Sequence, residues 1–267
     1  MNYRKRNKGI RFCGSKGKCG EIVQIIQELI PTSNGVYWEP FLGAAKIMQS
    51  IHCGKRYGTD SDPHIVSLLS HIQNGWIPPT SISEEEYKLW MGRRKKEKYQ
   101  YDPMMGFVGY GCSFGARYFQ GYARSKKGEV NFAASARTAL LRQKPFLKNV
   151  IFGHGDYRKV DAPKCEEMLI YCDPPYEGTK PVGGMKPFNN KKFWSWAVSK
   201  AHDHIVLVSE YQCPIDCAVV IWEKSVAAGI RFGTKGDGGG IGSGKRKLEK
   251  LFCINPEHAK GVGLGLF

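Results

Sequence analysis

The chain of 267 residues is 42% hydrophobic and 12% aromatic, which provides enough apolar material for a folded core and excludes a disordered protein. A formal net charge of +16 indicates a polyanionic partner, with nucleic acid favoured over an anionic membrane surface. No apolar run approaches the roughly 18 residues that a membrane-spanning helix needs. The basic N-terminus leads into no signal-peptide core, so we expect a cytoplasmic protein with no membrane partner.

Nine cysteines are scattered along the chain and none forms a CxxC pair. We therefore expect reduced thiols and no bound metal. His202 and His204 flank Asp203, but no third ligand follows at a suitable spacing. We interpret these three residues as a polar helix end, with metal binding as the lesser alternative.

The first expected element is an amphipathic helix from Glu21 to Ile30, which follows a Gly-rich turn in residues 10–18. Such a turn before a helix can bind an anion through its backbone N–H groups. It lacks the full phosphate-loop pattern, however, so by itself it indicates an anion site or no ligand at all.

A short strand at 36–38 is expected to run into the loop 39–45 and then into a helix that ends near Ser50. The small residues at 43–45 allow a bound ligand to approach the backbone closely. A purely structural strand-to-helix turn would have the same composition, so both interpretations stay open.

Residues 55–59 predict a second strand that ends at Asp60. A carboxylate in this position, after the second strand and about 20 residues beyond a Gly-rich turn, suits hydrogen bonds from a ribose diol. Asp62 precedes a proline, which favours it as the N-cap of a helix over 63–71. We assign Asp60 to the ribose and Asp62 to the cap.

After a capping box formed by Ser83 and Glu86, the composition changes. Residues 88–148 contain 14 Lys and Arg against 3 Asp and Glu, which places +11 of the net +16 in 61 residues, and eleven aromatic residues are interleaved. This combination favours phosphate neutralisation together with base stacking. A solvated helix end is the alternative for the run 93–96, and many of the aromatic residues belong to the core.

The chain is expected to return through a helix at 131–143 and a strand at 150–152. An apolar run at 168–170 then predicts a buried parallel strand, and the motif Asp173-Pro174-Pro175-Tyr176 follows it. The two prolines stop the strand and make the loop a rigid acceptor surface. The motif suits a planar base whose exocyclic amine donates to Asp173 and to the Pro174 carbonyl while its ring stacks on Tyr176.

Beyond the motif, residues 177–190 contain three glycines and two prolines, which is typical of a mobile lid. A helix begins near Phe193, and a basic cluster occupies 245–247. Three further strands are expected at 204–208, 218–222 and 251–252.

The Asp173–Tyr176 motif resembles the catalytic motif of amino-methylating DNA methyltransferases, and the chain as a whole resembles the bacterial and phage DNA adenine methylases of the Dam type. The resemblance implies methyl transfer from S-adenosylmethionine to the exocyclic amine of a flipped-out adenine in double-stranded DNA. It also implies an α/β fold with a Rossmann-like, class I methyltransferase sheet of about seven strands and an inserted, mainly helical target-recognition domain. We divide the chain into a cofactor-binding part (1–80), the inserted domain (81–148) and a catalytic part (149–267).

The resemblance also implies roles for individual residues. Asp156 either lies beside the adenine ring of the cofactor or caps a turn, and Ala45 stands where the family often has a second glycine. The expected catalytic residues are Asp173, Pro174 and Tyr176. Cofactor contacts are expected from Phe12, Lys16, Glu39, Phe41, Gly43, Asp60, Asp156 and Asp173. DNA contacts are expected from Arg93, Arg94, Arg117, Arg124, Lys126, Lys245 and Arg246.

Two other classes of function stay open. Related loops serve methylation of the cytosine amine or of RNA, and a methyltransferase fold can persist as a DNA-binding module without turnover. The chemically suitable residues at every expected position argue against such decay. The mechanism needs no covalent intermediate, so none of the cysteines is expected to act as a nucleophile, and no obligate protein partner is evident.

Overall fold

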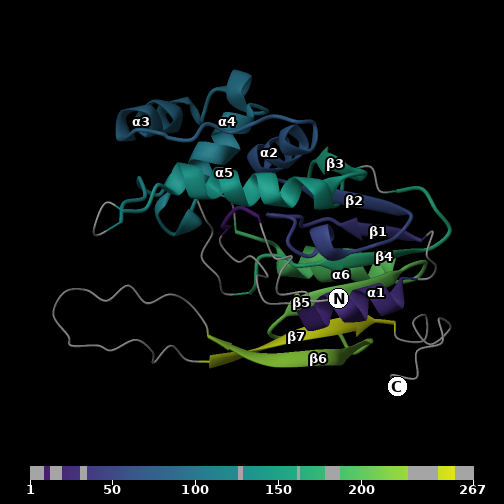
Figure 1. Cartoon of the computed structure of the whole chain (residues 1–267). Helices are drawn as coiled ribbons and strands as arrows, with labels where there is room; N and C mark the ends of the chain where they lie inside the picture. The colour runs from purple at the N-terminus through teal and green to yellow at the C-terminus, as the bar shows by residue number, and fades with distance from the viewer. Residues whose placement is uncertain are drawn as a thin grey trace.

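A seven-stranded sheet forms the centre of the computed structural model, which describes residues 9–12, 20–30, 35–125, 129–160, 163–177, 187–227 and 246–255 (Figure 1). The strands follow the order β3-β2-β1-β4-β5-β7-β6, in which β7 pairs antiparallel with both neighbours and the other pairs are parallel. Their bounds are β1 Val36–Glu39, β2 Lys55–Asp60, β3 Val150–His154, β4 Met168–Cys172, β5 Ile205–Glu210, β6 Ala218–Ala227 and β7 Arg246–Ile254. This order, with an antiparallel seventh strand beside the fifth, is that of the Rossmann-like class I methyltransferase fold, as expected from the sequence.

The central strands are buried on both faces, which explains their nearly continuous apolar sequences. All residues of β4 and of β5 are buried. Their side chains alternate between two apolar clusters: Leu169 and Tyr171 of β4 belong to the first, whereas Ile170 and Cys172 belong to the second. The period of two along each strand therefore feeds both faces of the sheet.

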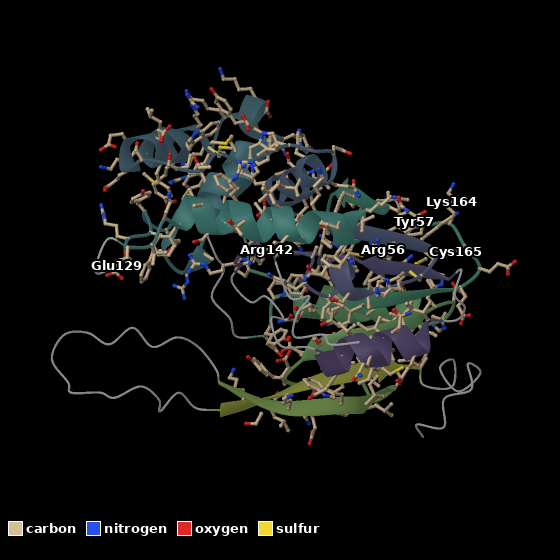
Figure 2. The ribbon with its side chains drawn as sticks, viewed as in Figure 1. Arg56, Tyr57, Glu129, Arg142, Lys164 and Cys165 are labelled. Atoms are coloured by element: carbon tan, nitrogen blue, oxygen red, sulfur yellow. The ribbon has the colours of Figure 1, made fainter. Side chains whose placement is uncertain are left out.

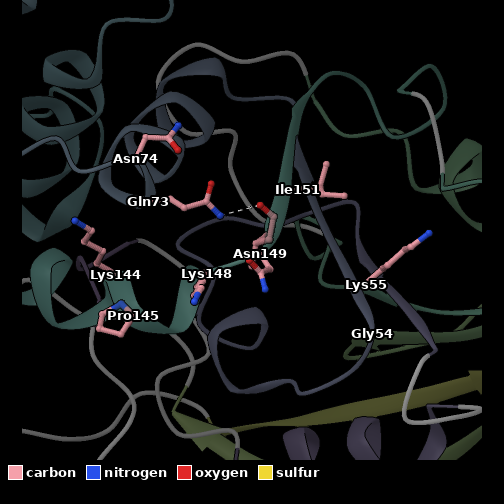
Figure 3. A pocket seen from close by; sticks show the side chains of 10 residues that line it. Gly54, Lys55, Gln73, Asn74, Lys144, Pro145, Lys148, Asn149 and Ile151 are labelled. Carbon is pink, nitrogen blue, oxygen red and sulfur yellow. Dashed lines mark hydrogen bonds between the residues drawn. The ribbon is translucent and has the colours of Figure 1, made fainter.

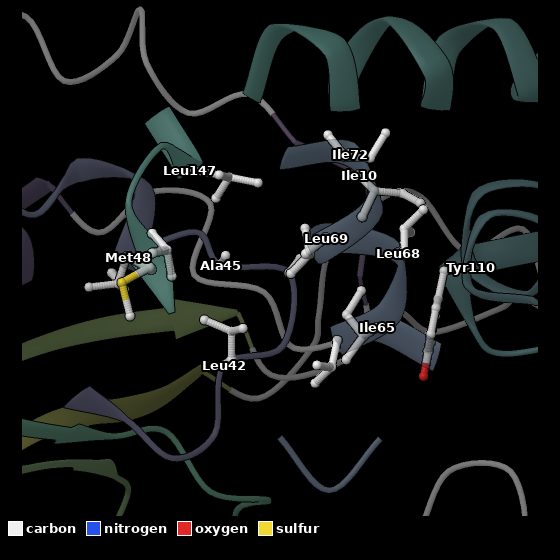
Figure 4. Close-up of a cluster of buried hydrophobic side chains, with 14 of the residues drawn as sticks. Ile10, Leu42, Ala45, Met48, Ile65, Leu68, Leu69, Ile72, Tyr110 and Leu147 are labelled. Atoms are coloured by element: carbon white, nitrogen blue, oxygen red, sulfur yellow. The ribbon is translucent and has the colours of Figure 1, made fainter. Parts of the chain in front are cut away.

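Helices cover these two faces. The first cluster lies under α1 (Gly20–Leu29) and α2 (Pro63–Gln73), and Figure 4 shows side chains of α2 meeting the loop after β1. The second cluster lies under α6 (Asn190–Lys200), whose Phe193 and Trp194 are buried against the sheet. The helix start expected at Asp62 is confirmed, because the Asp62 side chain accepts from the N–H of His64 at 2.8 Å. Helix α6 begins at Asn190, three residues before the expected Phe193.

The segment inserted between β2 and β3 is mainly helical, as expected. It contains α3 (Glu84–Arg93), α4 (Pro103–Gly106), a π-helical turn (Phe107–Gly111) and α5 (Phe132–Gln143). The predicted capping box at the start of α3 is present. The described part of this segment has no core of its own, because Phe107, Tyr110 and Leu140 belong to the same cluster as the helices of the sheet. The domain boundaries proposed from the sequence stay predictions.

Some expected elements differ from the structure. The helix expected after the loop 39–45 is only a single 3-10 turn, Met48–Ser50. Ala45 lies in the left-handed region with φ of 55°, which breaks the path of the chain before a helix can start. Strands β6 and β7 are longer than the apolar runs that predicted them, because their outer halves pair with each other rather than burying apolar side chains. Most of the expected lid, 178–186, lies outside the described residues.

Candidate active site at the carboxyl edge of the sheet

The functional residues expected from the sequence lie after neighbouring parallel strands. The register places Glu39 of β1 beside Gly58 of β2, two residues before Asp60. Cys172 at the end of β4 pairs with Val208 of β5. Since parallel strands end at one edge, Glu39, Asp60 and Asp173 share the carboxyl edge of the sheet. The strand order reverses between β1 and β4, and this switch point is where open α/β sheets bind their ligands.

Asp60 fastens the loop after β1 to the end of β2. Its carboxylate accepts from the N–H of Gly43 at 2.8 Å and from the N–H of Asp62 at 2.9 Å. Gly43 has φ of 48°, a conformation that suits glycine. Burial, together with the nearby Asp62 carboxylate, raises the pKa of Asp60 to about 6. The loop is therefore held in one conformation with its backbone facing the edge.

Phe12 covers this loop from the N-terminal segment. A Cβ atom added at Gly43 would lie 3.3 Å from the Phe12 ring, so the ring packs directly over the glycine. The same ring lies 4.8 Å from the ring of Tyr110, which belongs to the inserted segment. Lys46 donates to the Gly9 carbonyl at 2.8 Å and fixes the chain just before Phe12. Lys16, the other expected cofactor contact here, lies outside the described residues.

Glu39 is a buried carboxyl group at the end of β1, with 3% of its surface exposed. The Tyr37 hydroxyl donates to its Oε1 at 2.6 Å. Burial, with a smaller contribution from the Asp173 carboxylate, raises the pKa of Glu39 to about 8. At neutral pH Glu39 is therefore mostly protonated and uncharged.

The loop after β4 is tied to the end of β5. Glu210 accepts from the N–H of Glu177 at 3.1 Å and from the N–H of Tyr211 at 2.7 Å. Burial first, and the Asp173 carboxylate to a smaller extent, raise the pKa of Glu210. Pro174 is buried. Asp173 thus follows β4 between two buried acids that shift towards their neutral forms, one at the end of β1 and one at the end of β5.

Tyr176, the last residue of the motif, is anchored from two sides. Its hydroxyl donates to Oε1 of Glu249 on β7 at 2.9 Å. Its ring meets the ring of Tyr211 nearly perpendicularly, with centroids 4.7 Å apart. Sequence reasoning missed Glu210 and Glu249. The rule that selected Asp60, a carboxylate directly after a buried strand, would also have found Glu210, whereas the contact of Glu249 depends on pairing between distant segments.

No protein-family model and no curated protein matches the sequence. Among solved structures, two of the rRNA methyltransferase aviRa from Streptomyces viridochromogenes, at 1.5 Å and 2.4 Å, are similar to this chain at 14% and 13% identity. Each comparison covers 91% of this chain and 86% of the other chain, with a TM-score of 0.37.

Two of the residues expected to contact the cofactor, Asp156 and Phe41, interact with other residues of the protein in this structure. Asp156 caps its own turn: its carboxylate accepts from the backbone N–H and from the guanidinium of Arg158, both at 2.9 Å. This is the turn-capping alternative, and the contact with a cofactor adenine stays a prediction. Phe41 packs in an aromatic cluster, 5.1 Å from Tyr157 and 5.5 Å from Phe193 between ring centroids. A cofactor contact by Phe41 also stays a prediction.

The arginines expected at the DNA interface divide into two kinds. Arg93 lies over the rings of Trp90 and Tyr99, at 4.6 Å and 5.2 Å. Arg124 pairs with Glu84. Arg94, Arg117 and Arg124 are all exposed, whereas Arg93 is half-buried. Lys126 and Lys245 lie outside the described residues, and of Arg246 only the backbone, in β7, is described.

The inserted segment reaches the carboxyl edge through two tyrosines. The Tyr110 hydroxyl donates to Asp62, directly after β2. The Tyr101 hydroxyl lies 3.0 Å from Nδ1 of His154 at the end of β3. These contacts place the inserted segment next to the edge that carries Asp60. Many of its side chains project outward from the ribbon around α3 and α4 (Figure 2).

A hollow of about 770 Å³ lies at the other edge of the sheet, where β2 and β3 begin (Figure 3). It is separate from the edge that carries Asp60 and Asp173. The turn beside it is braced, since Gln73 donates to the carbonyls of Leu147 and Val150. Its lining includes Lys55, Lys144 and Lys148.

The described residues also bear on metals and membranes. Within them, the carboxylates of the edge do not gather with other ligands into a group that could hold a metal ion. No helix in the described ranges has both the length and the apolar character that crossing a bilayer requires.

Proposed function

We propose that this protein is an S-adenosylmethionine-dependent methyltransferase that methylates the exocyclic amine of adenine in double-stranded DNA. The observation that carries the proposal is the position of the motif Asp173–Tyr176. It follows a fully buried parallel strand and lies next to the switch point between β1 and β4. A rigid acceptor loop and an aromatic ring at that point suit a planar base that bears an amine.

The chain's own residues fit the cofactor. The loop around Gly43 presents its backbone beneath the Phe12 ring, and no side chain fits at Gly43 without pressing on that ring. Both oxygens of Asp60 accept backbone N–H groups, and a carboxylate has about four acceptor sites, so Asp60 can also accept from a ribose hydroxyl. S-adenosylmethionine, when bound, would supply an electrophilic methyl group at this edge.

The target base would be held by the motif. An adenine amine is stacked inside a duplex, so the base has to leave the helix to reach the loop. Asp173 and the Pro174 carbonyl would accept hydrogen bonds from the amine, while Tyr176 stacks on the ring. These bonds draw the nitrogen lone pair out of conjugation and orient it for attack. Catalysis is then mainly positioning and electrostatic preorganisation.

Charge at the edge supports this assignment. Positive charge develops on the amine nitrogen as its bond to the methyl carbon forms and the bond from that carbon to sulfur breaks, and Asp173 stabilises it. The methylated nitrogen then releases a proton to Asp173 or to water. Glu39 and Glu210, whose raised pKa values favour their neutral forms, limit repulsion around Asp173. No cysteine takes part.

The partner is proposed from the basic insertion. Of the net charge of +16, +11 belongs to residues 88–148. Tyr110 and Tyr101 bring this segment to the carboxyl edge. Exposed arginines such as Arg94 and Arg117 would neutralise phosphates on either side of a base that enters the site.

Methyl transfer from labelled S-adenosylmethionine to mixed-sequence double-stranded DNA tests the proposal, with nucleoside digestion and chromatography as the readout. Label in methyladenine is the expected result, and Asp173→Ala provides the inactive control. Label in methylcytosine would show that cytosine, and not adenine, is the acceptor. Label that appears only when RNA replaces DNA would show that the substrate is RNA. Thermal stabilisation by the cofactor without transfer to any nucleic acid would indicate an inactive relative.

A further inference from the structure

The outer halves of β6 and β7 form a two-stranded ribbon beside the catalytic edge. Pairing between β5 and β7 ends at Glu210 and Lys250, whereas pairing between β6 and β7 continues to Ala227 and Arg246. Residues 246–249 therefore extend past the carboxyl end of β5 with β6 as their one sheet neighbour among the described strands. Figure 1 shows this ribbon projecting from the sheet. It reaches the level of the loop that carries Tyr176.

Glu249 is the first residue of the ribbon beyond β5, and its side chain turns inward. Only 8% of its surface is exposed, although the neighbouring Leu248 is 42% exposed. Its Oε1 accepts from the Tyr176 hydroxyl at 2.9 Å. A buried carboxylate without such a donor would be destabilising, so this bond restrains both side chains.

The ring of Tyr176 is restrained from a second direction. Tyr211, directly after β5, meets it at 81° with centroids 4.7 Å apart. Lys247, also on the ribbon, lies over the Tyr211 ring at 4.4 Å. An anchored hydroxyl and an edge-to-face neighbour together limit rotation of the Tyr176 ring. The plane of the ring is therefore set before a base arrives.

We propose that Glu249 is a positioning residue that holds Tyr176 in the plane in which it stacks on the target base. This role rests on the proposed function. It adds to the motif a residue 73 positions further along the chain, on a different strand. Glu249 acts through Tyr176 and does not itself touch the reacting atoms. Its loss lowers kcat with little change in the KM for DNA, because phosphate contacts elsewhere hold the duplex.

Three variants test the role. Glu249→Ala removes the acceptor, and Tyr176→Phe removes the donor while keeping the ring. We expect each to lower kcat roughly 10- to 100-fold, the range that a small misplacement of a positioned group produces. Glu249→Gln keeps an acceptor oxygen and is expected to retain most of the rate. Glu223→Ala is the matched control, because Glu223 lies on β6 at the base of the ribbon, opposite Lys250, and its side chain is 53% exposed.

Two readouts separate positioning from folding. The double variant Tyr176→Phe/Glu249→Ala should be no slower than either single variant, because both remove the same hydrogen bond. In a duplex with 2-aminopurine at the target position, fluorescence of the bound base should rise in Glu249→Ala relative to wild type, since a mobile ring quenches less. Glu249→Gln should leave this signal near the wild-type value.

The outcomes distinguish the two proposals. Wild-type kcat in a folded Glu249→Ala variant, multiplicative rate losses in the double variant, or a loss in Glu249→Gln as large as in Glu249→Ala would each overturn the positioning role alone. If Glu249→Ala fails to fold, Tyr176→Phe and Glu249→Gln still decide the matter by rate and fluorescence. A wild-type protein that transfers no methyl group overturns the proposed function itself, and the positioning role with it.

Discussion

The carboxyl edge of the sheet and the inserted segment differ in the sign and in the solvent exposure of their charged side chains. At the edge, Glu39 is buried and Asp60 is half-buried, and desolvation raises the pKa of both. Along 88–148 the charges are basic, and Arg94 and Arg117 are exposed. The first arrangement fixes a few groups precisely at a loss of stability, and the second provides long-range attraction that tolerates imprecise placement. We expect substitutions in the two regions to affect different steps, orientation of the base at the edge and capture of the nucleic acid on the insertion.

The largest effect is expected at Asp173. Asp173→Ala removes the acceptor that would orient the amine and stabilise its developing charge, so kcat should fall by at least about 100-fold. Affinity for DNA should change little, since the basic insertion is untouched. Single-turnover transfer and a filter-binding assay on the same variant measure the two quantities. Equal losses of kcat and of DNA affinity would contradict the assignment of base orientation to the edge and of DNA capture to the insertion.

Glu39 tests how burial of an acid at the edge changes the pH dependence of stability. A carboxyl whose pKa rises from 4.5 to about 8 on folding keeps its proton in the folded state after the unfolded chain has lost it. The free energy of unfolding should therefore fall as pH rises between 4.5 and 8, with a slope of at most about 1.4 kcal/mol per pH unit from this group.

Glu39→Gln mimics the protonated acid and should remove that slope. Above about pH 7 the comparison is cleanest, because Asp60, whose pKa is about 6, is largely ionised there. Urea unfolding of both proteins across this range measures the difference. Parallel pH profiles for wild type and variant would show that Glu39 is ionised in the folded protein.

Gly43 tests the geometry of the loop. Gly43→Ala places a Cβ at φ of 48° and 3.3 Å from the Phe12 ring, so we expect a loss of about 1–2 kcal/mol in unfolding free energy and weaker cofactor binding. Gly92→Ala is the matched control. Gly92 lies in α3 with no atom within 4 Å of an added Cβ, so this change should stabilise the protein by about 0.5–1 kcal/mol. Chemical denaturation and calorimetric titration with the cofactor measure these effects.

The smallest effects are expected among single arginines. Arg94→Gln and Arg117→Gln should each weaken DNA binding a few-fold and reduce the slope of log affinity against log salt by about 1. Arg93→Gln should instead lower stability by about 0.5–1 kcal/mol, because Arg93 stacks on Trp90 and Tyr99. Salt titrations of binding, paired with thermal unfolding, separate the two kinds. An unchanged salt slope for both exposed arginines would place the DNA elsewhere.

Several elements could be predicted from the sequence because they depend on interactions between residues close together in the chain. The cap at Asp62 and the capping box at Ser83 depend on residues only two or three positions apart. The buried strand β4 and its position before Asp173 followed from a short apolar run stopped by two prolines. These features involve interactions close in sequence, and for that reason a single sequence is enough to predict them.

The sequence by itself determined the α/β sheet, the motif after β4 and the basic character of the inserted segment. Only the tertiary structure decided which partners individual charged groups meet: it pairs Arg124 with Glu84, turns Asp156 onto its own loop and brings Glu249 to Tyr176. The last of these contacts joins residues 73 positions apart through the register of antiparallel strands. Which strands pair, and therefore which distant residues meet, depends on the whole fold, so the pattern within one segment does not predict such a contact.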